Sequence, residues 1–169
     1  MDIDEPGWPL IDDFFLDLAE GRTAETVRRY ARVRLRLYEF LETGDMSLGL
    51  GTSPATLLDA ERQFHTSGAF WSLFGAPELV CCLPSFLHPT WWPDGVSQTR
   101  LQIRLTGRLL THLERSGSLD GVDVGCAFWE AEASVKEARH ELERRSAATV
   151  DDVDPSMPAR FLQQPGPEW

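Results

Sequence analysis

Apolar residues recur every three or four positions in several segments of this chain of 169 residues. The clearest such segment begins at Asp94 or Ser97 and ends at Gly117. One side of it carries Ile103, Leu105, Leu109, Leu110 and Leu113. The same spacing recurs over residues 10–20, 23–43 and 128–145. It follows the 3.6-residue turn of the α-helix, and no segment alternates as a half-buried β-strand does. We therefore expect an all-α fold.

The middle of the chain, residues 45–95, is predicted to contain shorter helices. Residues 44–52 are glycine-rich and predict a loop, whereas Ser53-Pro54 predicts the start of a helix that ends near Phe64. Glycines and prolines interrupt the apolar stretch that follows, so short helical pieces are expected near 69–74 and 78–87. Together with the long segments, this gives a bundle of about five to six helices with an enlarged middle segment.

The composition indicates one domain in a reducing compartment. A hydrophobic content of 42% is enough for one core, so we expect a single domain over residues 1–147 and an acidic, proline-containing tail over 148–169. Three cysteines, with Cys81 and Cys82 adjacent, form neither a disulfide framework nor a spaced metal site. The apolar runs are too short to span a membrane, and the N-terminal segment is acidic. A cytoplasmic protein without a membrane partner is therefore expected.

No motif of a known catalytic, cofactor or metal site occurs in the sequence. The histidines lack a second histidine or a cysteine at the spacing that a zinc site needs; they are His65, His88, His112 and His140. Glycine-rich nucleotide loops and the serine turn of hydrolases are missing, as are paired Glu-x-x-His elements. We therefore expect no enzyme activity, no cofactor and no bound metal.

Arginines gather on two of the predicted helices, although the net charge of the chain is −11. Nine of the fifteen arginines lie within residues 28–36 and 100–115. At a rotation of 100° per residue, four arginines lie on one side of the first helix, and four others lie on one side of the second. These are Arg28, Arg29, Arg32 and Arg36 on the first, and Arg100, Arg104, Arg108 and Arg115 on the second. Two such rows are typical of a surface that binds the phosphates of a polyanion. Solvated salt bridges to the acidic segments are the alternative.

Two further features have a structural interpretation. Arg34 falls within the apolar arc of its helix, and because a lone buried charge is costly we expect Asp13 or Asp17 to pair with it. The aromatic residues Phe70-Trp71 and Trp91-Trp92 could stack on bases or anchor a partner. Because they lie in a proline-rich apolar stretch, the interpretation that we favour is burial in the core.

Two segments resemble a known family. They are LIDDFFLDLAEGRTAETVRRYARVRLRLYEFLET, residues 10–43 with Thr26 and Tyr30, and SQTRLQIRLTGRLLTHLERSGSL, residues 97–119. In this order they resemble the core-binding domain of tyrosine recombinases and phage integrases. The resemblance covers about a third of the chain. It implies a SAM-like orthogonal bundle that clamps one side of a DNA duplex, with the two arginine-bearing helices crossing the groove.

The chain departs from that family in several respects. Only about 50 residues follow the second segment, whereas the family carries a separate catalytic domain there. A His-x-x-Arg spacing occurs at His112 and Arg115, but it lies inside the clamp-like helix, and the tyrosines Tyr30 and Tyr38 lie upstream. We therefore expect a non-catalytic protein that binds double-stranded DNA through the eight arginines, such as an accessory of a mobile element.

A protein-interaction module that does not bind DNA is the alternative function. In that case the contact with a partner, or with a second copy of the chain, would run through Trp91, Trp92 or the last helix.

Overall fold

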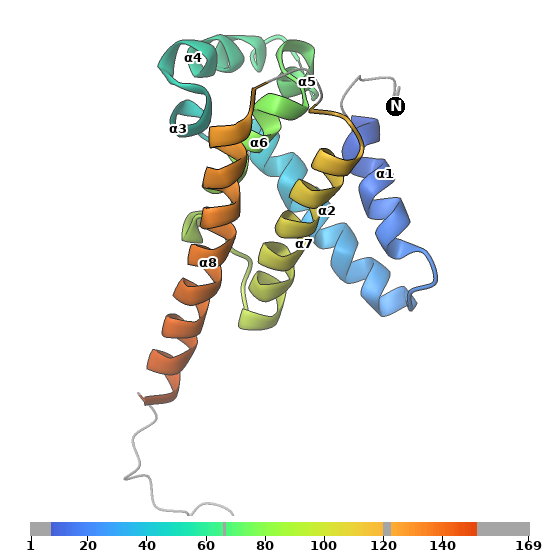
Figure 1. The fold of residues 1–169 in the computed structure, drawn as a ribbon, viewed down its shortest axis with the longest axis vertical. Helices are drawn as coiled ribbons and strands as arrows, with labels where there is room; N and C mark the ends of the chain where they lie inside the picture. The colour runs from blue at the N-terminus through green and yellow to red at the C-terminus, as the bar shows by residue number, and fades with distance from the viewer. Residues whose placement is uncertain (1–7, 66, 120–122, 152–169) are drawn as a thin grey trace, which may run out of the picture.

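The computed structural model describes residues 8–65, 67–119 and 123–151, and in this part of the chain the only regular elements are helices. Eight α-helices and one short 3-10 helix follow one another (Figure 1). They are α1 (Trp8–Ala19), α2 (Ala24–Thr43), α3 (Ser47–Leu50), α4 (Thr52–Glu61), α5 (Ala69–Leu73), α6 (Ala76–Phe86), η1 (Pro89–Trp91), α7 (Val96–Arg115) and α8 (Gly125–Asp151). The predicted all-α fold is confirmed. The eight α-helices exceed the predicted five to six, because the unpredicted helix α3 and the short α5 add to the six helices of ten residues or more; the SAM-like arrangement stays a prediction.

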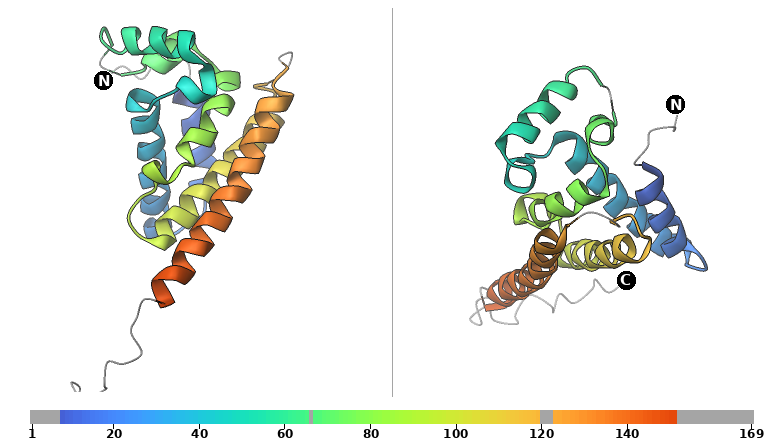
Figure 2. Two further views of the ribbon diagram at one scale, coloured as in Figure 1. Left: turned by 90° about the vertical axis from the view of Figure 1, so that its left-hand side faces the viewer. Right: turned by 45° about the horizontal axis from the view of Figure 1, so that its top comes forward.

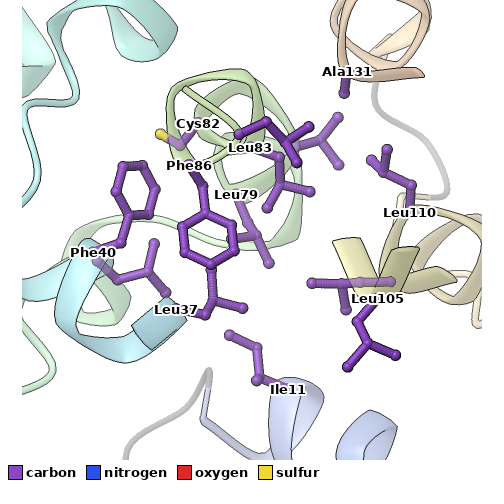
Figure 3. Close-up of a cluster of buried hydrophobic side chains, with 14 of the residues drawn as sticks. Ile11, Leu37, Phe40, Leu79, Cys82, Leu83, Phe86, Leu105, Leu110 and Ala131 are labelled. Carbon is purple, nitrogen blue, oxygen red and sulfur yellow. The ribbon is translucent and has the colours of Figure 1, made fainter. Parts of the chain in front are cut away.

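Helix α6 packs against α3, α7 and α8. The long helices α7 and α8 run side by side in opposite directions along one side, α1 and α2 form a second pair, and α3 to α5 gather at one end (Figures 1 and 2). Side chains from five helices meet in one core (Figure 3). Each is at most 2% exposed: Ile11, Leu37, Phe40, Leu79, Cys82, Leu83, Phe86, Leu105, Leu110 and Ala131. One continuous core therefore fixes how α7 and α8 sit relative to α1 and α2.

Both ends of α2 are capped by side chains. At its start, the backbone N–H of Thr26 donates to Oγ1 of Thr23 over 3.4 Å. At its end, the guanidinium of Arg62 donates to the carbonyl oxygens of Leu41 (2.7 Å) and Gly44 (3.0 Å). A cation that satisfies the last carbonyls also suits the negative end of the helix dipole.

The predicted loop over residues 44–52 is wrong, because it contains helix α3. The backbone N–H of Ser47 donates to the carboxylate of Asp45 over 2.8 Å, which supports the first turn of α3. Gly49 lies so close to α6 that a Cβ atom would be 2.3 Å from the carbonyl oxygen of Cys81. This tertiary contact, which has no local sequence pattern, holds α3 in place. Helix α4 then begins at Thr52 and ends at Glu61, earlier than predicted at both ends.

The predicted partner of Arg34 is also wrong. Its Nη1 atom lies 3.1 Å from a carboxylate oxygen of Asp12, which also accepts a hydrogen bond from the hydroxyl of Tyr38. Asp13 and Asp17 are exposed, whereas Asp12 lies at the edge of the buried face of α1. Burial and the Asp12 carboxylate both raise the pKa of Tyr38 above its ordinary value. The three side chains link α1 to α2.

Helix α8 continues through the predicted domain boundary at residue 147 and reaches Asp151. The rest of the predicted tail, residues 152–169, lies outside the described residues. Within the described ranges, no helix combines the length and the apolar character needed to cross a membrane.

Candidate nucleic-acid interface

The four predicted arginines of α7 all lie on its exposed face. Arg100, Arg104, Arg108 and Arg115 are exposed, while the leucines of the opposite face are buried in the core. Among the residues that the structure describes, none of these arginines has a carboxylate oxygen within 4.0 Å. Their charges are therefore available to an anionic partner.

Two cations of α8 extend this row. Arg104 and Arg108 line a groove of about 290 Å³ between α7 and α8, and Lys136 and Arg139 line the same groove. The helices pack closely here: a Cβ atom on Gly107 would lie 3.4 Å from a methyl group of Val135. This close packing lets cations from both helices flank one groove, where Glu132 is the carboxylate among the lining residues.

Lys136 and Arg139 are not among the site residues predicted from the sequence. On the predicted last helix they stand among glutamates in an alternating pattern that is typical of a solvated face. The signal that could have singled them out is their i, i+3 spacing on a helix that packs against α7 at Gly107. We call the six cations Arg100, Arg104, Arg108, Arg115, Lys136 and Arg139 the α7–α8 cationic face.

A second groove lies on the other side of the α7 row. It has a volume of about 470 Å³ and runs between α1 and α7, where Phe14, Asp17, Arg108 and Arg115 line it. The ring of His112 lies 5.3 Å from that of Phe14. His112 and Arg115, the two residues of the His-x-x-Arg spacing, therefore both line this groove.

The four predicted arginines of α2 are more engaged with the protein itself. Arg28 lies 3.4 Å from Glu25, with both side chains well exposed. Arg29 donates to Oγ of Ser97 (2.8 Å) and to Oε1 of Gln98 (3.1 Å), so it fastens α2 to the start of α7.

Arg32 and Arg36 line a third groove of about 380 Å³, together with the carboxylates of Glu39 and Asp94. The arginines of this groove come from α2, whereas the two grooves beside the α7 row hold arginines of α7. Arg32 and Arg36 of α2 thus line a different groove from Arg104, Arg108 and Arg115 of α7.

The tryptophans predicted as core residues belong mainly to the core. Phe70 and Trp71 are 0% and 5% exposed, which confirms that interpretation. Trp91 is half-buried, with its ring 5.1 Å from that of Phe40. The indole N–H of Trp92 donates to the carbonyl oxygen of Leu87 over 2.8 Å, and the guanidinium of Arg145 lies 5.2 Å from the centre of a ring of Trp92. Among the tryptophans whose exposure the structure describes, Trp129 is largely exposed, at 73%, and it was not among the aromatic residues noted in the sequence.

The histidines and cysteines do not form a cluster in the described ranges. His65 lies 2.9 Å from Glu61 and His140 lies 3.7 Å from Glu143. No three histidine, cysteine or acidic side chains of the described residues are placed to share one metal ion. Burial raises the pKa of the Cys82 thiol to about 12.

No protein-family model matches the chain, and neither a curated protein nor a solved structure matches it. The resemblance of residues 10–43 and 97–119 to the recombinase core-binding domain therefore rests on those residues alone.

Proposed function

We propose that this chain is a non-catalytic DNA-binding protein that holds the phosphate backbone of a duplex on its α7–α8 cationic face. The observation that carries the proposal is the set of six cations without a carboxylate within 4.0 Å among the described residues. Elsewhere Arg34, Arg62, Arg144 and Arg145 all pair with carboxylates. In a chain with a net charge of −11, unpaired cations gathered on one face suit an anionic ligand.

The dimensions of the arginine row suit a duplex. Arg100 and Arg108 are eight residues apart on α7, which places them about 12 Å apart along the helix axis. This is about the width of the major groove of B-DNA. Guanidinium groups can bind phosphate oxygens with two parallel hydrogen bonds, which favours arginine for such contacts.

The resemblance of residues 97–119 to the clamp of tyrosine recombinases supports DNA as the polyanion, because α7 is the helix that would cross the groove. It also supports the further proposal that the protein is an accessory of a mobile element. In this account Arg29 is a positioning residue that holds α2 against α7. Arg28, which pairs with Glu25, and Arg32 and Arg36, which line a separate groove, make contacts at the edge.

A salt-titrated binding experiment tests the proposal. Fluorescence anisotropy of a labelled duplex should show log affinity falling with log salt at a slope of roughly −5, because each of six phosphate contacts contributes about −0.9. The double variant Arg104→Ala/Arg108→Ala should weaken binding to unrelated sequences alike and lower the steepness by about 2. A flat salt dependence, or no binding at about 50 mM salt, would refute DNA binding through this face.

A further inference from the structure

The largest groove described lies at the end of the molecule where α3 meets α6 and the first turns of α8. Its volume is about 700 Å³, and its walls include the apolar surfaces of Pro84, Trp91 and Ala127. Leu48 stands at the groove with 89% of its side chain exposed. The close approach of Gly49 to α6 sets α3, and with it Leu48, beside this groove.

The charge at this groove is negative. Asp45 and Glu130 line it, both are exposed, and neither has a cation within 4.0 Å among the described residues. Hydrogen bonds from Ser47 lower the pKa of Asp45, so its carboxylate stays ionised. The pKa of the Cys81 thiol is raised first by burial and then by the nearby charges of Glu78 and Glu130.

The groove is separate from the α7–α8 cationic face. Glu130 and Arg139 are nine residues apart on α8, which places them on opposite sides of that helix. Carboxylates at a groove repel phosphates, so nucleic acid does not suit it. A cleft of this volume with apolar walls and a few charged groups suits an inserted side chain from a ligand.

We propose that this groove binds a short peptide segment of a partner protein, in which an apolar side chain stands next to an arginine or lysine. The apolar side chain packs between Leu48, Trp91 and Ala127, and the cation faces Asp45 and Glu130. Charge complementarity selects the basic segment, and the apolar walls supply contact area. This role does not depend on DNA binding.

Selection from a displayed library of random peptides of about 12 residues, followed by affinity measurement on an enriched synthetic peptide, tests the proposal. The enriched peptides should pair Leu, Ile, Met or Phe with Arg or Lys. Glu130→Arg should weaken binding of the synthetic peptide at least about tenfold. The matched control Glu143→Arg, also exposed and on α8 but outside the groove, should change it by less than about twofold.

A second pair of variants tests the apolar contact. Leu48→Ser should weaken binding of the same peptide about fivefold, because it removes an exposed side chain at the groove without opening the core. Leu57→Ser is the control, since Leu57 is also exposed (54%) but does not line the groove. All four variants should unfold within a few degrees of the unchanged protein.

Several results would overturn the proposal. The selection could yield no enriched peptide or only acidic peptides, or Glu130→Arg and Glu143→Arg could weaken peptide binding equally. The protein could also have twice the mass of one chain in solution, with Leu48→Ser reducing that mass to that of a monomer. The last result would assign the groove to a second copy of the chain. Duplex binding by the Glu130→Arg variant, measured in parallel, separates this test from that of the DNA proposal.

Discussion

Removing the two cations of α8 that share a groove with the α7 arginines should weaken DNA binding strongly. The perturbation is the double variant Lys136→Ala/Arg139→Ala. Each phosphate contact adds about 0.9 to the salt slope. At about 0.15 M salt, one contact therefore raises the affinity about fivefold relative to its contribution at about 1 M salt. Losing both contacts should therefore lower the affinity about thirtyfold and reduce the slope by about 2. Anisotropy of a labelled duplex over a range of salt concentrations measures both quantities.

The matched control is Arg144→Ala/Arg145→Ala, which removes the same charge from the same helix. Both of these arginines pair with Glu141, and Nε of Arg145 donates to its carboxylate over 2.6 Å. We expect the control to lower the affinity less than about threefold, through the general field alone. Equal losses in the two double variants would show that net charge governs binding, and an unchanged affinity in Lys136→Ala/Arg139→Ala would exclude the groove from the interface.

Three further predictions concern stability and reactivity. Gly49→Ala should lower the free energy of unfolding in urea by about 2 kcal/mol, because the added methyl group would meet a backbone carbonyl of α6 at 2.3 Å. The control Gly125→Ala, at an exposed glycine, should change this free energy by less than about 0.5 kcal/mol. Equal effects of the two variants would contradict the close packing of α3 against α6. Arg62→Met should cost about 2 kcal/mol in the same assay, since the end of α2 loses its charged donor, and no loss would refute this cap. A thiol reagent near pH 8 should label the exposed Cys126 rapidly and Cys82 only on unfolding, because burial raises the pKa of Cys82; rapid labelling of Cys82 would contradict its burial.

The long helices could be predicted from the sequence because each carries its own periodic apolar face. The core side of α7, from Ile103 to Leu113, shows this pattern without reference to any other segment. Helix α3 could not be predicted, since four residues are too few to show a period and its position depends on contact with α6. For Arg34 the need for a carboxylate could be predicted, but the choice of Asp12 depends on how α1 is rotated against α2.

Part of the candidate site could likewise be predicted from the sequence, and part of it could not. Spacing alone predicts that the arginines of α7 share an exposed face, because burial of the opposite leucines fixes the rotation of the helix. The spacing of residues along the sequence cannot show which residues of other helices lie next to a row of arginines in the folded chain. Ser97 and Gln98 engage Arg29, whereas Lys136 and Arg139 add to the charge of the α7 row, and both facts arise from tertiary packing.

The most direct test of the central proposal is an NMR titration of the uniformly labelled protein with a short duplex at low salt, followed through backbone amides and arginine Nε–Hε signals. We predict that the largest shifts occur at residues 100–115 and 132–139, and that added salt reverses them. Largest shifts along α2 alone or around Leu48 and Glu130, or no shifts when an excess of duplex is present, would contradict it.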